Sequence, residues 1–164
     1  MASIDLSASP KGATPNGSSF KIAIIVASWN DHITSNLLKG CVDTLIQSQV
    51  SKENILIECV PGSFELPIAA HWMIQKHQPD AVICLGCIIK GDTYHFELVG
   101  DACARGIMNL TLQTGVPVIM GVLADYNEKQ SLERSGGSKG NKGIEAAYTA
   151  LRMAEMAKNY KLNS

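Results

Sequence analysis

One histidine near the middle of the chain follows a short polar turn, an arrangement suited to proton transfer beside a bound anion. His95 ends the segment Lys90-Gly91-Asp92-Thr93-Tyr94-His95, which directly follows an apolar run. An imidazole with an unperturbed pKa of about 6.5 can take up and return protons at neutral pH. A helix that begins after such a turn presents free backbone N–H groups to an anion, and Asp92 is expected to cap it. His95 is therefore a candidate catalytic residue, with a purely structural role as the alternative.

Two other segments carry side chains suited to a planar, polar ligand. Trp29 follows the first apolar run, where its ring can stack on a heterocycle or cover the edge of a sheet. In Val60-Pro61-Gly62-Ser63-Phe64-Glu65-Leu66-Pro67, Ser63 is expected to cap a helix that has Pro67 in its first turn. Glu65 either favours the helix N-terminus or accepts hydrogen bonds from a ligand. Residue type alone leaves both pairs of alternatives open.

A basic, glycine-rich stretch lies in the last third of the chain. Residues 134–143 hold four glycines and three cations, and we expect a flexible loop there. The stretch has no G-x-x-x-x-G-K-[ST] motif and no suitable strand before it, which excludes a P-loop NTPase. Arg134 is the candidate phosphate ligand in this stretch, because a guanidinium group binds two oxygens at once.

Cys84 and Cys87 form a C-x-x-C pattern inside an apolar run. Redox and zinc sites of this pattern normally need an exposed turn or a second cysteine pair. We therefore predict that both thiols are small core residues. His71 and His77 have no partners at metal-ligand spacing, so no metal site is predicted.

The elements that must position these residues follow from an alternation of apolar runs and helical patterns. The runs are continuous, which is typical of strands covered on both faces, and crossovers of this length indicate a parallel, doubly wound α/β sheet. Ligands bind outside the carboxyl ends of such strands, where the polar segments lie. The predicted strands are residues 21–27, 55–60, 81–89 and 116–123. Apolar stripes predict helices around residues 37–46, 96–110 and 144–151, Pro67 indicates the first turn of a further helix, and a shorter helix is expected near 127–134.

Composition limits the class of protein. The chain has 164 residues, 46% hydrophobic and 18% charged, which indicates one globular domain. We place it at residues 20–164, after a flexible segment at 1–19 rich in Ser, Gly, Pro and Thr. A net charge of −1 argues against a nucleic-acid binder, and no apolar run is long enough to cross a membrane. With no signal-peptide pattern and an odd count of five cysteines, we expect a cytoplasmic protein.

The order and spacing of these segments resemble the 6,7-dimethyl-8-ribityllumazine synthase family over residues 21–156. The resemblance is carried by Trp29-Asn30 with Ile33-Thr34, Val60 to Pro67, Leu85-Gly86, Ile89 to Thr93 with His95, Gly115 to Val118, Glu133-Arg134 and Gly140 to Gly143. It implies a flavodoxin-like three-layer α/β/α sandwich with a four-stranded parallel central sheet. It also implies a cofactor-free condensation of 5-amino-6-(D-ribitylamino)uracil with 3,4-dihydroxy-2-butanone 4-phosphate, the penultimate step of riboflavin biosynthesis.

The resemblance assigns a role to each candidate residue. Trp29 stacks on the pyrimidine, and His95 moves protons during imine formation and phosphate loss. Arg134 neutralises the phosphate, and Lys142 adds positive charge nearby. The remaining substrate-binding residues are Ser63, Phe64 and Glu65 at the ribityl chain and ring edge, Cys87, Ile88 and Ile89 at the strand end, Asp92 and Thr93 at the phosphate, and Met120, where the family often has an aromatic ring.

The resemblance also implies a homo-pentamer with active sites between adjacent subunits. Met120, Arg134 and Lys142 would then serve a neighbour's Trp29 and His95. A normal loop length around residues 136–139 favours a shell of sixty subunits, and riboflavin synthase is a candidate partner.

Other functions on the same fold remain as alternatives to compare. A non-catalytic protein that binds flavin or lumazine, or only forms a shell, is the main one, and the presence of His95, Arg134 and Lys142 favours the enzyme. A flavodoxin-like electron carrier would need a Ser/Thr-rich phosphate loop after the first strand, where Ser28-Trp29-Asn30-Asp31 stands instead. A nicotinamide-dependent dehydrogenase would need G-x-G-x-x-G, which is missing.

Overall fold

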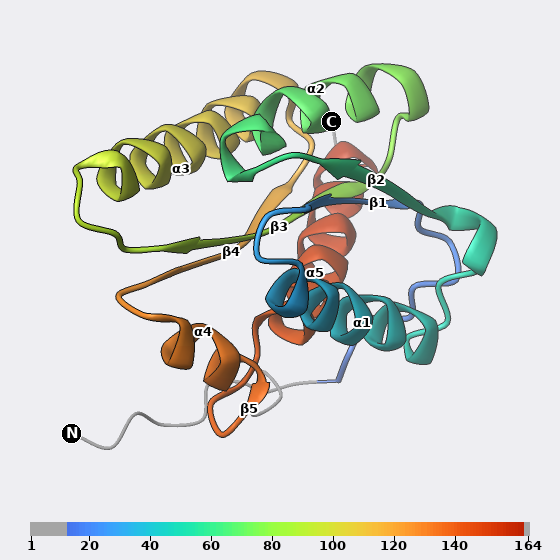
Figure 1. Ribbon diagram of the computed structural model, residues 1–164. Helices are drawn as coiled ribbons and strands as arrows, with labels where there is room; N and C mark the ends of the chain where they lie inside the picture. Colours follow the sequence, from blue (N-terminus) through green and yellow to red (C-terminus); the bar gives the residue numbers. More distant parts are fainter. Residues whose placement is uncertain (1–12, 163–164) are drawn as a thin grey trace.

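A parallel sheet with helices on both faces forms the centre of the computed structural model, which describes residues 13–162 (Figure 1). The sheet has four strands in the order β2-β1-β3-β4. Helices α1 and α5 pack on one face, and α2 and α3 pack on the other. This confirms the predicted three-layer sandwich. The elements are β1 (Ile22–Ala27), α1 (Asp31–Gln47), β2 (Ile55–Val60), α2 (Leu66–His77), β3 (Ala81–Ile89), α3 (His95–Thr114), β4 (Val118–Asp125), α4 (Glu128–Arg134), β5 (Ser135–Gly137), β6 (Gly140–Asn141) and α5 (Lys142–Leu162), with 3₁₀ turns η1 (Lys52–Asn54) and η2 (Ser63–Glu65).

The strand limits agree closely with the apolar runs, except at β4. This strand begins two residues later than predicted, because Pro117 has no N–H to donate to the ladder, and it also ends two residues later. The Pro117 carbonyl still accepts a hydrogen bond of 2.9 Å from the Val82 N–H, just before the paired region. At the other end, Asp125 pairs with Ile89. The carboxyl end of β4 therefore lies level with that of β3, beside the predicted site.

Burial separates the edge strand β2 from the central strands. Every residue of β1 is buried, and so is β3 up to its last residue. The prediction that all four strands are covered on both faces is wrong for β2, in which Ile57 is 47% exposed in this single chain, and for Met120 of β4, which is 38% exposed. Both strands lie at the ends of the strand order, and β2 is the less covered of the two. An apolar strand is thus left open at one side of the sheet.

The residues before β1 make contacts with the end of α1. The Gly17 N–H donates to the Ser48 carbonyl at 2.6 Å, and Phe20 is buried in the core. Of the segment predicted to be flexible, residues 1–12 lie outside the described residues, and the domain boundary at residue 20 stays a prediction. In the described part of the chain, no helix is both long and apolar enough to span a membrane.

Candidate functional site

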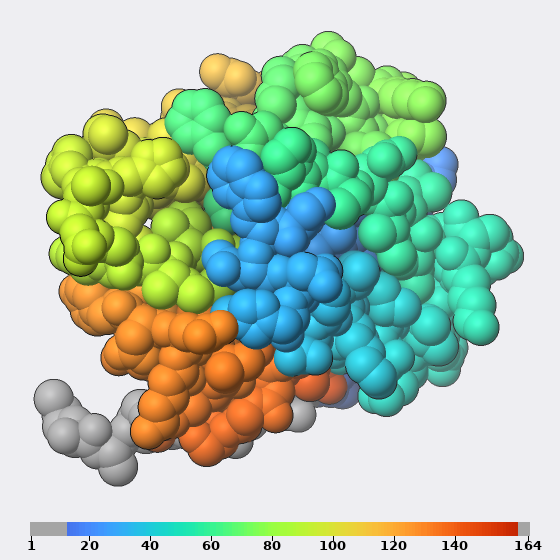
Figure 2. Space-filling model, in the orientation of Figure 1, coloured from blue at the N-terminus to red at the C-terminus, as the bar shows by residue number. Residues whose placement is uncertain are grey.

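A cavity of about 520 Å³ opens at the carboxyl ends of β1, β2 and β3. Its wall is mostly apolar, with a few polar groups directed into it, which is the usual composition of a small-molecule site. The segments that form it meet on one face of the molecule, where Figure 2 shows the blue start of α1 and the yellow-green start of α3 next to the orange α4. The lining residues are Trp29, Asn30, Ser63, Phe64, Glu65, Cys87, Ile88, Ile89, His95, Leu98 and Val99.

The turn after β1 holds Trp29 at the cavity mouth. Asn30 adopts a left-handed backbone conformation (φ 59°), and its side-chain amide donates to the Cys87 carbonyl at 3.0 Å. The backbone N–H of Trp29 donates to the Pro61 carbonyl at 3.0 Å. A Cβ on Gly62 would lie 2.5 Å from the Trp29 ring, so glycine leaves room for the indole. The ring is 64% exposed and is therefore available to stack on a ligand.

The turn after β2 supplies a free hydroxyl and a carboxylate. Ser63 does not cap a helix as predicted, since its hydroxyl is buried without a hydrogen-bond partner among the described residues. Gly86 permits this position, because a Cβ there would lie 2.5 Å from Ser63 Oγ. Glu65 Oε2 accepts a hydrogen bond of 3.0 Å from the Gly62 N–H, so Glu65 closes the turn. Its other carboxylate oxygen is left for a ligand.

The turn after β3 brings His95 to the cavity as the first residue of α3. Asp92 does not cap this helix. Tyr94 occupies the N-cap position, and no side chain caps the helix there. The first amides of α3 therefore keep their donors directed at the space before the helix. Asp92 and Thr93 are exposed in the turn and do not line the cavity.

Three cavity residues were not among the predicted site residues. Leu98 and Val99 lie one turn beyond His95, so the helical period from His95 was the signal that pointed to them. The sequence indicates Asn30 only as the neighbour of Trp29, whereas in the structure its side-chain amide connects the turn after β1 to Cys87 of β3.

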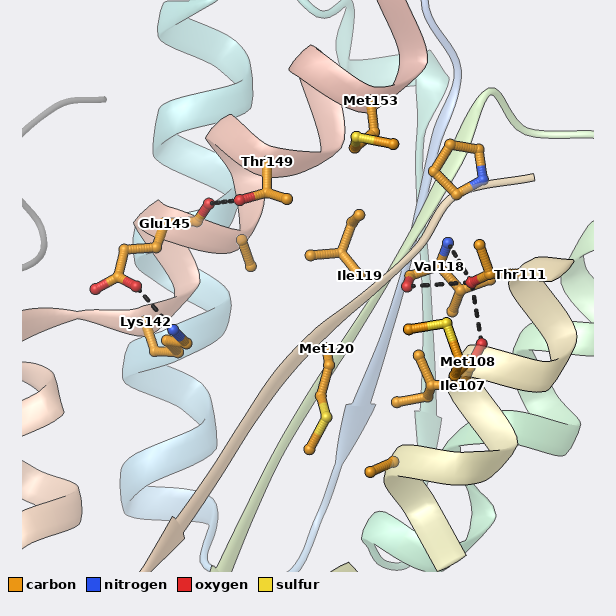
Figure 3. A pocket seen from close by; sticks show the side chains of 13 residues that line it. Ile107, Met108, Thr111, Val118, Ile119, Met120, Lys142, Glu145, Thr149 and Met153 are labelled. Atoms are coloured by element: carbon orange, nitrogen blue, oxygen red, sulfur yellow. Dashed lines mark hydrogen bonds and ion pairs between the residues drawn. The ribbon is translucent and has the colours of Figure 1, made fainter. Parts of the chain in front are cut away.

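Lys142 and Met120 lie away from this cavity. They line a second cavity of about 350 Å³ between α3, β4 and α5 (Figure 3). Lys142 Nζ pairs with Glu145 Oε2 at 2.8 Å, and the methionines Met108 and Met153 contribute to an apolar wall. Methionine side chains adapt easily to an incoming surface.

Arg134 ends α4 and lines neither cavity. Its Nη1 donates to the Gln130 carbonyl at 3.2 Å and lies 3.8 Å from Asp125 Oδ1. The glycine-rich stretch that follows is not the flexible loop expected, because β5 and β6 pair as a short hairpin. The Asn141 amide fixes this hairpin to α1 by donating to the Asn36 carbonyl at 3.0 Å.

The two cysteines of the C-x-x-C pattern lie in β3 with exposed fractions of 0% and 5%, as predicted for core residues. Burial raises the pKa of both thiols, and for Cys87 the negative charges of Asp125 and Glu128 add to the effect. A thiol with a raised pKa is a poor nucleophile, so Cys87 serves the cavity as a neutral wall. Among residues 13–162, no three His, Cys, Asp or Glu side chains come together in a way that suits a metal ion.

Most of the predicted residues thus line the first cavity, and Met120 and Lys142 line the second, while Asp92, Thr93 and Arg134 line neither. The cavity at the carboxyl edge has an aromatic platform, hydrogen-bonding groups and an imidazole, but no lysine or arginine lines it. Such a cavity can hold a polar heterocycle beside a proton carrier. The cations predicted for a phosphate lie elsewhere on the chain.

Comparison with known proteins assigns a family to this arrangement. The sequence model described as 6,7-dimethyl-8-ribityllumazine synthase matches residues 19–158. The chain is 46% identical to the 6,7-dimethyl-8-ribityllumazine synthase of Porphyromonas gingivalis over 87% of this chain and 88% of that protein. It is 46% identical to the protein of the same name from Cytophaga hutchinsonii over 93% and 97%, and 42% identical to that of Flavobacterium psychrophilum over 98% and 85%.

Proposed function

Because the chain belongs to the 6,7-dimethyl-8-ribityllumazine synthase family, we propose that the cavity at the carboxyl edge is its active site, completed by residues of a second copy. The chain is a transferase of riboflavin biosynthesis. It condenses 5-amino-6-(D-ribitylamino)uracil with 3,4-dihydroxy-2-butanone 4-phosphate to give 6,7-dimethyl-8-ribityllumazine, phosphate and water.

In our proposal the pyrimidine lies in the cavity against Trp29, with Cys87, Ile88 and Ile89 as the wall. The free hydroxyl of Ser63 supports a hydrogen bond to the substrate, and so does the carboxylate oxygen of Glu65 that the Gly62 N–H leaves unused. Phe64, which is 58% exposed, covers the ribityl chain at the mouth. An unpaired buried hydroxyl is costly, so a ligand that bonds Ser63 gains affinity.

The phosphate-bearing substrate would lie before the N-terminus of α3, where the exposed Asp92–Thr93 turn leaves backbone amides free. His95 transfers protons as the amine of the pyrimidine attacks the ketone, as water leaves and as phosphate is eliminated. The amine of the substrate itself forms the imine, so no lysine of the enzyme is needed as a nucleophile. Holding the two reactants together contributes several kcal/mol, on the order of the effects known for intramolecular reactions.

The cations come from an adjacent copy in this proposal. Arg134 binds the phosphate oxygens, Lys142 adds positive charge, and Met120 contacts the heterocycle. The observation that carries this step is that none of the three lines the cavity of its own chain. A head-to-tail interface repeated in a closed ring produces such shared sites.

We propose a homo-pentamer that can build a shell of sixty subunits. The open edge of the sheet supports an interface there, since Ile57 on β2 is half exposed in the single chain. Riboflavin synthase, which would take the product, is the candidate partner. We propose the cytoplasm as the location, supported by five cysteines that are all free.

The direct test is the appearance of the fluorescent lumazine when purified protein is given both substrates. We expect formation well above the uncatalysed background. No acceleration by a folded, oligomeric protein would instead favour the non-catalytic binding or shell-forming alternative.

A further inference from the structure

The turn between β3 and α3, which binds the phosphate group in our proposal, is held by few hydrogen bonds of its own. Residues 91–95 are all exposed, and no side chain caps α3. Backbone hydrogen bonds fix only its two ends, from the Lys90 N–H to the Asp125 carbonyl at 3.0 Å and from the Leu98 N–H to the Tyr94 carbonyl at 3.3 Å. Something else must hold the residues between these ends in one conformation.

One ion pair bridges this turn. Lys90, the residue after β3, donates from Nζ to Oε1 of Glu97, in the first turn of α3, at 2.9 Å. The two side chains are only 42% and 33% exposed, and the second carboxylate oxygen of Glu97 is buried without a hydrogen-bond partner among the described residues. The pair thus joins Lys90, just before the exposed residues 91–95, to Glu97, just after them.

Two aromatic rings extend the contact to a third segment. Lys90 Nζ lies 5.8 Å from the centre of the Phe96 ring and 5.6 Å from that of Tyr126, which follows β4. The two ring centres are 6.4 Å apart. A cation over aromatic faces is attracted to both, so one ammonium group joins β3, α3 and the segment after β4.

The charges of the pair also support each other. The hydrogen bond with Glu97 raises the pKa of Lys90, and the same bond lowers the pKa of Glu97. Both groups are therefore charged throughout the neutral range. Neither residue lines the active-site cavity, so their influence on a ligand there is indirect.

We propose that Lys90 and Glu97 are positioning residues, which hold the 91–94 turn in the shape that receives the phosphate group of the substrate. The proposal rests on the proposed function, in which this turn and the α3 amides bind that phosphate. The proposal predicts that removing either charge raises KM for the phosphate substrate, because the turn needs both charges. A lysine that bound phosphate directly would predict opposite effects, since removing Glu97 would free the ammonium for the anion.

The test compares Glu97→Gln and Lys90→Met with Lys90→Arg, in the intact oligomer. We expect KM for the phosphate substrate to rise about three- to fivefold in the first two variants, as an ion pair of modest exposure allows. KM for the pyrimidine and kcat should stay within about twofold of the wild type, and Lys90→Arg should restore most of the loss. Lys39→Met is the matched control, because Lys39 pairs with Asp43 at 2.6 Å on α1, away from the cavity.

Two outcomes would overturn the proposal. A lower KM for the phosphate substrate in Glu97→Gln would make Lys90 a direct ligand, and an unchanged KM in both variants would make the pair merely structural. Amide hydrogen exchange of the ligand-free protein gives an independent readout, in which the Lys90 and Leu98 N–H groups, whose hydrogen bonds close the two ends of the turn, should exchange faster in Glu97→Gln than in wild type and in the Lys39→Met control. Equal exchange rates would also overturn it. The wild-type assay distinguishes failure of this proposal from failure of the proposed function. If the wild type forms no product, the proposed function is refuted, whatever the exchange shows.

Discussion

The cavity beside β1 and β3 and the cavity beside β4 contrast in what each lacks. The first has a stacking ring, an unpaired hydroxyl and an imidazole, and no lysine or arginine lines it. The second has Lys142 among methionine and aliphatic side chains, and no histidine or aromatic ring lines it. A substrate pair made of a heterocycle and a phosphate ester needs both sets. In our proposal, an adjacent copy brings these two sets of groups together.

Strands β2 and β3 differ in a related way. Both were predicted from apolar runs, yet β3 is buried while residues 57–59 of β2 are exposed. The run of β2 includes Glu58, whereas that of β3 has no charged residue. In our proposal, a second copy covers the exposed part of β2.

The largest expected effect comes from the half that carries the imidazole. His95→Ala should lower kcat about 10²- to 10⁴-fold, because proton transfer loses its carrier. Steady-state kinetics with both substrates measures this effect. His71→Ala, on α2 and outside the cavity, is the matched control. An unchanged kcat in His95→Ala would remove His95 from the chemistry.

The next effect belongs to Arg134, which lines neither cavity of its own chain and which an adjacent copy supplies in our proposal. Arg134→Ala should raise KM for the phosphate substrate about 10- to 100-fold, since a charge-assisted bond to the phosphate is lost. KM for the pyrimidine should change little. Arg152→Ala provides the control, because Arg152 is paired with Glu155 on α5. Normal saturation by the phosphate substrate in Arg134→Ala would argue against a phosphate-binding role.

The smallest effect should come from the apolar contact of Met120. Met120→Ala removes part of a flexible side chain that contacts the heterocycle, so KM for the pyrimidine should rise about three- to tenfold. The phosphate substrate should saturate the variant normally. Titration with each substrate in turn separates the two effects, with Met156→Ala as control. A selective loss of phosphate affinity would contradict the contact.

Most of the fold could be predicted from the sequence, because buried central strands and the buried face of each helix require apolar residues at regular positions. The loops were harder, since their backbone depends on contacts between distant segments. Ser63 looks like a helix cap by type, but its hydroxyl is buried against Gly86 of β3, where only a glycine leaves room for it. Asn141 sits among glycines that suggest mobility, but its bond to the Asn36 carbonyl orders them.

The site was predictable in part for the same reason. The residues at the ends of β1, β2 and β3 meet because parallel strands end at one edge of the sheet. The separation of Met120, Lys142 and Arg134 from that cavity has no local sequence signal, because it depends on the strand order and on the hairpin after α4. The role of the Lys90–Glu97 pair likewise follows only from the distance across its turn.

The claim that two copies share each site is tested most directly by complementation. His95→Ala and Arg134→Ala are co-expressed in equal amounts, and wild type is co-expressed with the double variant as the reference. Both samples are assayed with the phosphate substrate well below its wild-type KM, where a site that lacks either side chain contributes little activity. If a site takes His95 from one chain and Arg134 from the next, random mixing makes about a quarter of the sites complete in both samples. If each site lies within one chain, the first mixture stays inactive and the reference keeps about half of the wild-type activity. Recovery of about a quarter in both is the result we predict, and an inactive first mixture would contradict the account.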